Sequence, residues 1–501
     1  MKCSEYLKKV ENENLKELIK KYIEKNCDED VILIRVPARI NLLGTHIEHR
    51  GGFINTLTID KNLWCIAGKR KDRKVYVYDF EEEKYKSQIF DIDEELPEKG
   101  IIWTDFIRKV KIVQGDWSNY IKAGVLYLQN KFPKMNISGV NLFFYGEIPT
   151  GAGLSSSSAI VVATMSAIIN LYNLPIKKEE LPEMCGEAEW FVGTRGGSGD
   201  HASMILGREN YITHIRFFPF VVEYIPFPQN YKIICCNSLI EAKKSANAKD
   251  VFNERVATYI IGLKLIKNKF PEIGIKLNYI RDINRKNLGS DKVIYNILLN
   301  LPYKLKRFEI YETLKDQELD KIFETHKEPE NGYAIRDVLL YGISECARAD
   351  ICSELLKKNN INEFGKLMYI SHDGDRVVKF LKNGKKVKWN YRVSDEYLKK
   401  LIKHSESKDE KERKKTEIYY QPGAYRCSVE DVDFIVDLVK NIKGVKGAKI
   451  TGAGLGGCVV ILVEENKVEN VLDILYKKYY KSRNLNFASF VCNSVNGVEI
   501  I

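Results

Sequence analysis

The chain has 501 residues, of which 44% are hydrophobic and 29% are charged, and its formal net charge is +11 at pH 7. This length exceeds what one ordinary hydrophobic core supports, so we expect two domains. The densest lysine run, at 399–416, alternates bases with acids, which favours a solvated segment over a nucleic-acid interface. The surplus positive charge is better explained by a small anionic ligand.

Eleven cysteines are scattered along the chain without a C-x-x-C pair, so the sequence predicts neither a disulfide framework nor a zinc site. No apolar run approaches the roughly 20 residues that a membrane span needs. The first residues resemble a charged amphipathic helix and lack the apolar region of a signal peptide. We therefore expect a cytoplasmic protein with reduced thiols.

The first part of the chain alternates between helical and strand patterns. Residues 1–30 are predicted to form a helical extension, and residues 31–228 a mixed α/β domain. Within that domain the predicted elements are a β-rich run from Val31 to Pro37, strands at 63–70 and 74–79, a helix at 119–130, and a strand at 140–145.

A second domain is predicted over 229–501. It opens with a strand at 231–237 and continues with helices over much of 250–358. Its last elements are a helix at 432–442, strands at 448–451 and 458–464 around a glycine turn, a helix at 467–481, and a strand at 487–493. This order is typical of an antiparallel sheet with helices on one face. The regions near 284–331 and 374–422 are interpreted as insertions.

A glycine-serine loop lies between the strand at 140–145 and a smooth apolar helix, with the sequence Y-G-E-I-P-T-G-A-G-L-S-S-S-S-A-I-V-V-A-T over 145–164. Glycines let backbone N–H groups approach a ligand, and the helix directs its positive dipole end to the same place, so phosphate is the expected guest. A serine-rich helix cap is the alternative, but a cap needs one hydroxyl and not four. The candidate ligands are Gly151, Gly153, Leu154, Ser155, Ser156, Ser157 and Ser158.

The glycine turn at 451–458, T-G-A-G-L-G-G-C, contains G-x-G-x-x-G in Gly452, Gly454 and Gly457. A dinucleotide site needs that motif to open a helix, whereas the residues from Cys458 onward have the pattern of a strand. We expect instead a glycine hairpin, including Gly456, whose backbone presses against a phosphate loop or a substrate. A purely structural tight turn would not need four glycines.

A polar segment follows the first strand, R-I-N-L-L-G-T-H-I-E-H-R-G-G-F over 39–53. This density of hydrogen-bonding groups beside glycines suits recognition of a polyol, and an ordinary polar loop is an equal alternative. His46 and His49 are three residues apart, but no third ligand at suitable spacing is nearby, so the spacing does not predict a metal site.

The segment G-E-A-E-W-F-V-G-T-R-G-G-S-G-D-H-A-S-M, at 186–204, carries Glu187 and Glu189 at the end of a helix and presents Asp200 and His201 after glycines. A carboxylate held in this way is a plausible base for a sugar hydroxyl. The alternative is that Asp200 caps the next helix.

In this order, the polar segment, the glycine-serine loop and the glycine turn resemble three motifs of the GHMP kinase superfamily, and within it the galactokinases. Weaker similarities lie at W-S-N-Y-I-K-A-G-V, F-N-E-R and E-F-G-K-L-M-Y-I-S-H. No Walker A sequence is present. The resemblance implies a two-domain α+β fold, with an N-terminal domain like ribosomal protein S5 domain 2 and a C-terminal ferredoxin-like domain.

The resemblance also implies an ATP- and Mg²⁺-dependent monosaccharide kinase that acts on the anomeric hydroxyl. Asp200 matches the aspartate that accepts the sugar's proton, and Arg39 the arginine beside the reacting centre. Ser156 matches a phosphate ligand and Ser157 the Mg²⁺-binding serine. The acidic partner of the metal falls on Ala188 by the galactokinase spacing and on Glu189 by the mevalonate kinase spacing, so Glu189 is favoured over Glu187. Trp117 and Tyr120 match positions near the adenine pocket.

The departures from the galactokinase pattern concern the sugar. Thr45 stands where galactokinases have a glutamate, Glu48 where they have an aspartate, and Phe252 at or near a family tyrosine. The string H-I-x-H-x-G-G is similar to galacturonokinase, so galactose and galacturonic acid are the first candidate substrates. The residues implied in substrate binding are Arg39, Thr45, His46, Glu48, His49, Asp200 and Phe252. A non-catalytic sugar and ATP sensor remains an alternative, and a kinase for mevalonate or homoserine is disfavoured by the polar segment.

Overall fold

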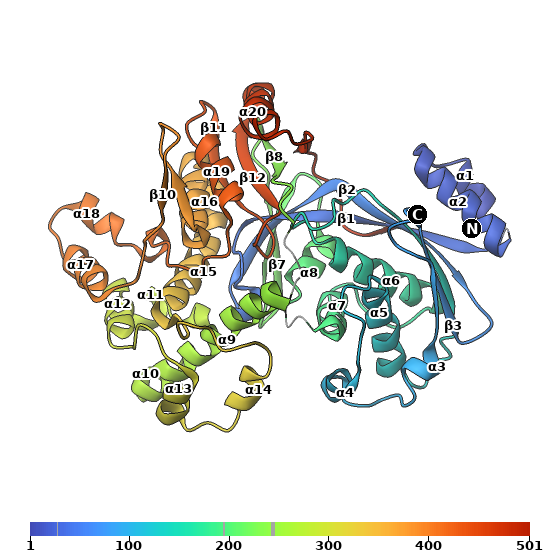
Figure 1. Cartoon of the computed structure of the whole chain (residues 1–501), viewed down its shortest axis with the longest axis horizontal. Coiled ribbons are helices and arrows are strands. Elements are labelled where there is room, and N and C mark those ends of the chain that lie inside the picture. Colours follow the sequence, from blue (N-terminus) through green and yellow to red (C-terminus); the bar gives the residue numbers. More distant parts are fainter. Residues whose placement is uncertain (28, 194–195, 242–245) are drawn as a thin grey trace.

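The computed structural model describes residues 1–27, 29–193, 196–241 and 246–501, without the side chains of 246–249. Two residues of the glycine segment before Asp200, at 194–195, lie outside the described part. Two long strands, β1 (Val31–Leu43) and β2 (Phe53–Lys69), cross the middle of the molecule, with helices grouped on either side (Figure 1).

The first sheet contains, among the described residues, eight strands in the order β14-β1-β2-β5-β3-β4, with β6 pairing with β2 and β7 pairing with β6. The pairing of β3 with β5 is parallel and the other pairings are antiparallel. The remaining strands of this sheet are β3 (Lys74–Asp79), β4 (Gln88–Asp91), β5 (Val140–Gly146), β6 (Tyr211–Arg216), β7 (Val221–Pro226) and β14 (Glu499–Ile500).

Both faces of this sheet are covered, which explains the almost uninterrupted apolar character of β1. Side chains alternate between the faces, so Ile34 joins the main core while Leu33 faces a smaller core beneath the N-terminal helices. The helices of the smaller core are α1 (Cys3–Leu7) and α2 (Glu13–Asn26). The helices on the side of the main core are α3 (Ile92–Glu95), α4 (Trp103–Lys109), α5 (Ser118–Lys131), α6 (Ser156–Tyr172), α7 (Leu181–Glu189) and α8 (Gly199–Leu206).

Strand β1 does not end at Pro37, as its sequence suggested, but continues to Leu43. Its pairing with β2 shifts register between Pro37 and Ala38. A proline, which lacks an N–H donor, is tolerated at such a bulge. Arg39 and Asn41 therefore lie on the strand itself, and the irregular part of the polar segment begins at Gly44. We call residues 44–52 the sugar loop, after the role that the sequence resemblance predicts for them.

The second sheet is antiparallel, with strand order β11-β12-β8-β13. Its strands are β8 (Tyr231–Asn237), β11 (Val445–Ile450), β12 (Cys458–Glu464) and β13 (Ser489–Cys492). Ile234 on β8 packs with residues of α19 (Glu430–Val439) and α20 (Val468–Leu475), while Ile233 shares a core with α16 (Ile361–Asp375). The sheet is thus covered on both faces, and the expectation of helices on one face alone was wrong.

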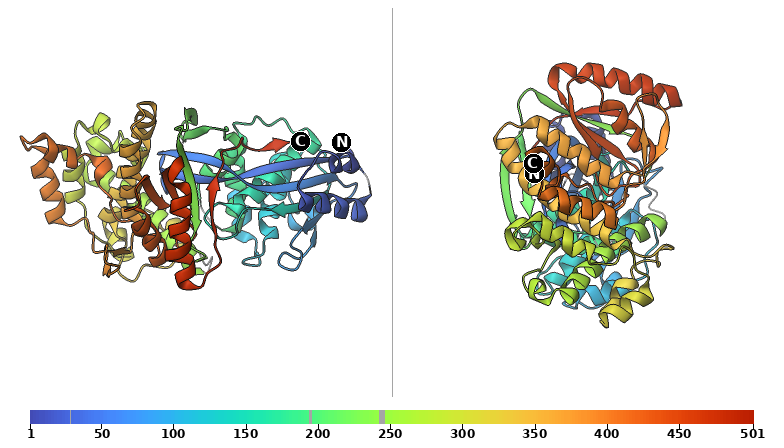
Figure 2. Two further views of the ribbon diagram at one scale, coloured as in Figure 1. Left: turned by 90° about the horizontal axis from the view of Figure 1, so that it is seen from above. Right: turned by 90° about the vertical axis from the view of Figure 1, so that its left-hand side faces the viewer.

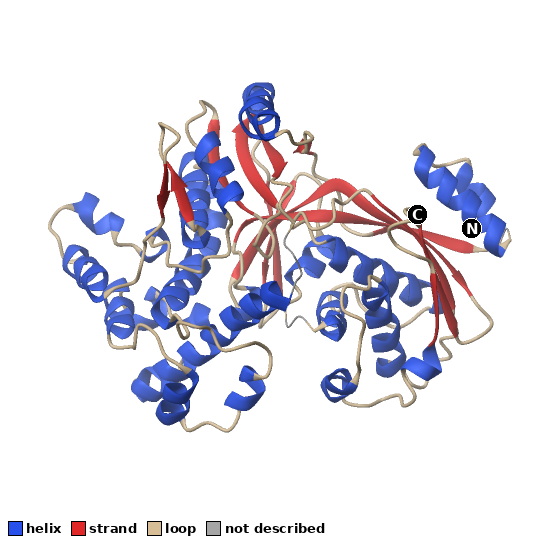
Figure 3. Ribbon diagram, in the orientation of Figure 1, coloured by secondary structure: helices blue, strands red, loops and turns tan. Residues whose placement is uncertain are grey.

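A helical group lies in sequence between β8 and β11 of the second sheet and in space to one side of the two sheets (Figure 3). Its long helices, α9 (Ala246–Lys269) and α15 (Ile335–Lys357), pack against each other. The regions interpreted as insertions contribute Leu298 and Leu401 to the same core. The other elements of this group are α10 (Pro271–Gly274), α11 (Arg285–Leu288), α12 (Asp291–Leu299), α13 (Arg307–Leu314), α14 (Leu319–Phe323), β9 (Val378–Phe380), β10 (Lys386–Lys388), α17 (Asp395–Ser405) and α18 (Glu410–Lys415).

The last residues of the chain leave the second sheet and return to the first, where β14 pairs with β1 through Ile34 and Ile500. Figure 2 shows that the two ends of the chain consequently lie together. Among the described residues, no helix combines the length and the apolar character needed to cross a membrane.

Candidate active site

Strand β1 connects the three segments that the sequence singled out. Arg39 Nη1 donates a hydrogen bond to the carbonyl oxygen of Gly153 in the serine loop, at 2.8 Å. Two residues further along, the backbone N–H of Asn41 donates to Thr451 Oγ1 at the start of the glycine turn, at 3.0 Å. The polar segment, the serine loop and the glycine turn therefore meet at one place, although up to about 400 residues separate them along the chain.

The glycine turn lies directly against the serine loop. Gly452 has φ +82°, and a Cβ atom at this position would lie 2.4 Å from the carbonyl oxygen of Gly153. The backbone N–H of Cys458 donates to Ala152 O at 2.9 Å. Since β12 begins at Cys458, the glycines end in a strand and a dinucleotide site is excluded. The close approach of the two loops is the packing expected from the sequence.

The N-terminus of α6 is not capped by the serine that precedes it. Ser155 adopts a left-handed backbone conformation with φ +60°, and its side chain makes no capping hydrogen bond. Its hydroxyl instead donates to Asp200 Oδ2. The first N–H groups of this 17-residue helix thus receive no hydrogen bond from Ser155, and they can serve a bound phosphate.

Asp200 is held in place by a bidentate ion pair with Arg39. The guanidinium donates from Nε to Oδ1 and from Nη2 to Oδ2, both at 2.7 Å. Burial raises the pKa of Asp200, but the charge of Arg39 and the hydrogen bonds from Arg39 and Ser155 together lower it below its ordinary value. The carboxylate is therefore ionised. With 40% of its side chain exposed, it can also accept a hydrogen bond from a ligand.

Asp200 lies within α8 and does not cap it, because the N-cap position is occupied by Ser198. The capping alternative considered from the sequence is therefore wrong. The ion pair with Arg39 joins α8, one of the helices that cover the first sheet, to β1, a strand of that sheet. This arrangement fixes the carboxylate next to the serine loop.

The two glutamates at the end of α7 point to different neighbours. Glu189 Oε2 accepts a hydrogen bond from Ser158 Oγ at 2.8 Å and lies 2.7 Å from His201 Nε2. Glu187 instead accepts a hydrogen bond from Tyr127 on α5. Burial raises the pKa of Glu189, but His201 and Ser158 lower it below its ordinary value. Glu189 is therefore an anion beside the N-terminus of α6.

Trp117 lies beside the beginning of the serine loop. Its ring packs edge-on against Phe144 near the end of β5, with centroids 6.0 Å apart, and lies 5.7 Å from Tyr85. The Tyr85 hydroxyl is 3.0 Å from Thr150 Oγ1, directly before Gly151. Tyr120, one turn further along α5, is partly buried against the main core. Contact of Trp117 and Tyr120 with an adenine base stays a prediction.

The sugar loop is anchored by a buried ion pair that the sequence reasoning missed. Glu345 Oε1 accepts hydrogen bonds from the backbone N–H groups of Gly44 at 2.8 Å and Thr45 at 3.1 Å. Its other oxygen pairs with Arg348 Nε at 2.6 Å, and both side chains are fully buried. The available signal was a glutamate and an arginine three residues apart inside the apolar run of α15. Thr45 Oγ1 in turn accepts a hydrogen bond from buried Lys449.

Glu48 connects the sugar loop to the segment that carries Asp200. A Cβ atom at Gly197 would lie 2.6 Å from Glu48 Cγ, so the glycine there permits close approach. Glu48 Oε1 lies 3.3 Å from His49 Nδ1. Burial raises the pKa of Glu48, while His49 lowers it to below the ordinary value. Two carboxylates, at 48 and 200, thus border the place where the sugar loop faces the serine loop.

His46 lies on an aromatic cluster that comes from distant parts of the chain. Its ring stacks on Tyr425, with centroids 4.4 Å apart and planes inclined by 14°. Tyr425 also contacts Tyr341 and Tyr259, with centroids 4.9 and 5.9 Å away. Phe252, which was assigned to the substrate, is half-buried near the start of α9, and its role stays a prediction.

Family comparisons agree with this geometry. The GHMP kinases N terminal domain matches residues 119–208, which include the serine loop and Asp200, and the GHMP kinases C terminal domain matches residues 398–481, which include the glycine turn. The galactokinase galactose-binding signature matches residues 20–69, which include the sugar loop. The chain belongs to the GHMP kinase superfamily. The resemblance inferred from the three motifs is thereby confirmed.

The relatives of this GHMP kinase include galactokinases along nearly its whole length. It is 26% identical to a galactokinase of Fusobacterium nucleatum over 465 residues, 92% of each chain. It is 25% identical to a galactokinase of Roseiflexus sp. over 468 residues, which cover 93% of this chain and 92% of the relative.

A solved structure of Lactococcus lactis galactokinase complexed with galactose superposes on this GHMP kinase with a TM-score of 0.70. The two share 20% sequence identity, and the match covers 97% of this chain and 99% of the other. The predicted two-domain α+β fold is confirmed.

Proposed function

We propose that the chain transfers the γ-phosphoryl group of ATP to the anomeric hydroxyl of a hexose or a hexuronic acid. Sugar kinase activity, the enzyme class expected from the sequence, accords with the galactokinases among its relatives. The observation that carries the proposal is the position of Asp200, which Arg39 and Ser155 hold between the serine loop and the sugar loop.

Asp200 is the base of the proposed reaction. As an ionised carboxylate on a partly exposed side chain, it accepts the proton of the sugar hydroxyl while the oxygen attacks the phosphoryl group. Arg39 orients the carboxylate through two hydrogen bonds and places positive charge beside the serine loop, where negative charge develops on the transferred group. Glu48 and His49, which contact each other in the sugar loop, are assigned to sugar binding.

The residues next to α6 fit the divalent cation that phosphoryl transfer uses. Glu189 supplies a carboxylate, and Ser157 a hydroxyl on the same first turn as Ser158, which bonds Glu189. Oxygen ligands of this kind suit Mg²⁺. When bound with ATP, the ion neutralises charge on the phosphates. We assign the acidic ligand to Glu189, because it lies against Ser158 on the first turn of α6, whereas Glu187 is turned toward Tyr127 on α5.

For the acceptor we infer a preference for galacturonic acid over galactose. At the position of Thr45 a neutral hydroxyl faces the ammonium group of Lys449. Within the described part of the chain, Arg50 Nε in the sugar loop is buried without a hydrogen-bond partner, and burial lowers the pKa of Arg50 to about 10. A guanidinium whose Nε lacks a hydrogen-bond partner can donate to a carboxylate, and a uronic acid provides one.

The test is ADP release by the purified chain with ATP, Mg²⁺ and a panel of hexoses, uronic acids and amino sugars. We expect turnover that Asp200→Asn lowers by about 10²-fold or more. The Arg50→Gln variant should lower kcat/KM for galacturonic acid by about tenfold while changing kcat/KM for galactose little. An equal loss for both sugars would contradict the role of Arg50.

Two outcomes would overturn the broader proposal. If Asp200→Asn retains turnover within about threefold of the wild type, Asp200 is not the base. If the chain binds ATP and a sugar, for example by calorimetry, but forms no ADP with any sugar of the panel, it is a sensor and not a kinase.

A further inference from the structure

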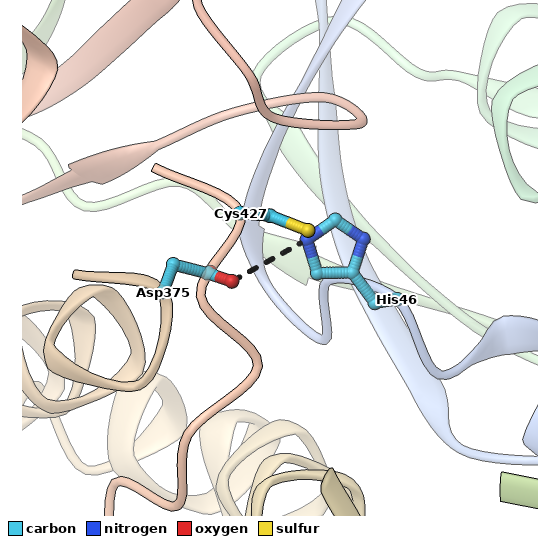
Figure 4. Close-up of side chains that lie close together, drawn as sticks. All are labelled: His46, Asp375 and Cys427. Atoms are coloured by element: carbon cyan, nitrogen blue, oxygen red, sulfur yellow. Dashed lines mark ion pairs between the residues drawn. The ribbon is translucent and has the colours of Figure 1, made fainter. Parts of the chain in front are cut away.

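Three side chains converge at the sugar loop, and one of them, His46, is also implied in substrate binding by the sequence resemblance. His46 comes from the sugar loop, Asp375 from the last position of α16, and Cys427 from the segment before α19. Figure 4 shows these side chains pointing toward one another from three separate segments. His46 Nε2 lies 3.7 Å from Asp375 Oδ1, and one ligand atom from each of the three residues lies within 4.8 Å of the others.

Two of these ligand atoms are buried without a hydrogen-bond partner among the described residues. His46 is 5% exposed and Asp375 is fully buried. Among the described residues, neither His46 Nε2 nor Asp375 Oδ1 has a hydrogen-bond partner. A buried polar atom left without a partner costs about 1–3 kcal/mol. At 3.7 Å the two atoms are too far apart to satisfy each other by a hydrogen bond.

The surroundings hold both side chains in this orientation. The His46 ring is stacked on Tyr425, and its backbone adopts φ +66°, which is unfavourable for a residue with a side chain. Asp375 is held through its other oxygen, Oδ2, which accepts a hydrogen bond from Tyr341 OH at 3.3 Å. The unpartnered atoms are therefore fixed toward a common point.

A nitrogen, a sulfur and an oxygen ligand form the donor set of a zinc site, and thiolate sulfur is not a ligand for Mg²⁺ or Ca²⁺. A thiolate and a carboxylate supply two negative charges for a dication. The positive charge of Lys449, near Asp375, disfavours a bound cation. The negative charge of Glu345, which also acts on Asp375, offsets that of Lys449. Three protein ligands leave one coordination position for water.

We propose that His46, Asp375 and Cys427 bind one Zn²⁺ ion, which ties the sugar loop to the C-terminal domain. The thiol of Cys427 loses its proton to solvent when the ion binds. This site is separate from the phosphate and Mg²⁺ ligands around α6, and the inference does not depend on the identity of the sugar.

The experiment is a titration of the metal-stripped full-length chain with Co²⁺, a spectroscopic substitute for Zn²⁺, without ATP or sugar. We expect one equivalent to produce the visible bands of a tetrahedral site and a thiolate-to-cobalt charge-transfer band, and one equivalent of Zn²⁺ to remove both. The charge-transfer band should be lost in Cys427→Ser. It should persist in Cys346→Ser, a matched control with a buried cysteine outside the cluster.

Asp375→Asn provides a second variant in case Cys427→Ser fails to fold, as judged by circular dichroism. This variant should weaken Zn²⁺ binding by about 10-fold or more, because it removes a charged ligand. The proposal is overturned if folded wild-type protein gives no charge-transfer band with Co²⁺. It is also overturned if the band survives in folded Cys427→Ser, because another thiol is then the ligand.

Discussion

Replacement of Arg348 by methionine should destabilise the protein mainly through the charge that it leaves behind. Glu345 and Arg348 are both fully buried and lie 2.6 Å apart. Removal of one partner of such a pair costs about 3–5 kcal/mol, because the buried carboxylate of Glu345 then keeps only the charge of Lys449 as compensation. Arg348 also donates to the carbonyl oxygens of Tyr419 and Gln421, at 3.2 and 2.7 Å, and each of these bonds contributes about 1 kcal/mol.

A second substitution separates the effect of the unpaired Glu345 charge from the effect of the hydrogen bonds lost with Arg348. In the double variant Glu345→Gln/Arg348→Met, the glutamine oxygen can still accept from the N–H groups of Gly44 and Thr45, but no carboxylate is stranded. We therefore expect the double variant to be about 2 kcal/mol more stable than Arg348→Met alone.

Urea unfolding followed by tryptophan fluorescence measures this difference through the transition midpoint. The exposed pair of Lys358 and Glu354, also 2.6 Å apart, is the control, and its substitution should change stability by less than about 0.5 kcal/mol. If the double variant is no more stable than Arg348→Met, the stranded charge is not the source of the loss and the reasoning fails.

Three further predictions concern the phosphate site and the pH dependence of stability. Glu189→Gln should raise the Mg²⁺ concentration needed for half-maximal turnover by about tenfold, whereas Glu187→Gln should not, and equal effects would contradict the assignment. Gly452→Ala should raise KM for ATP about tenfold or more, because its Cβ would meet the serine loop, whereas Gly289→Ala, with a similar φ of +85° but open space, should leave KM unchanged. Burial raises the pKa of Asp79 from 3.8 to about 6, so the folded state binds this proton more tightly and the associated stability, about 3 kcal/mol, is lost as the pH rises from about 4 to about 6. In Asp79→Asn the urea midpoint should vary less with pH over that range. If the midpoint of this variant depends on pH as steeply as that of the wild type, Asp79 is not the titrating group.

The sequence predicted those features that depend on neighbours along the chain. Strand 458–464 has the bounds expected from its apolar run, and its position after the glycines excluded a dinucleotide site before the structure was known. The grouping of Arg39, Asp200 and the serine loop followed from resemblance to motifs whose order is preserved. In each case the signal lies within short segments of the sequence.

Features that join distant segments could not be predicted in this way. The sugar loop depends on Glu345, about 300 residues away, and no periodicity relates the two. No third ligand lies near His46 and His49 in sequence, whereas Asp375 and Cys427 approach His46 only through the fold. The end of β1 was misplaced because Pro37 usually breaks a strand, and only the pairing with β2 reveals that a bulge accommodates it.

The pairing of β14 with β1 has a consequence for the order in which the molecule can be assembled. One side of β1 stays open while a ribosome makes the roughly 450 residues that separate it from Glu499. Until those residues emerge, the strand presents free backbone groups of the kind that recruit chaperones or promote aggregation. A fragment of residues 31–228, the first domain as delimited from the sequence, would keep this open edge permanently. The two domains are therefore not interchangeable modules, and exchange of the C-terminal domain between homologues would have to carry the final strand with it.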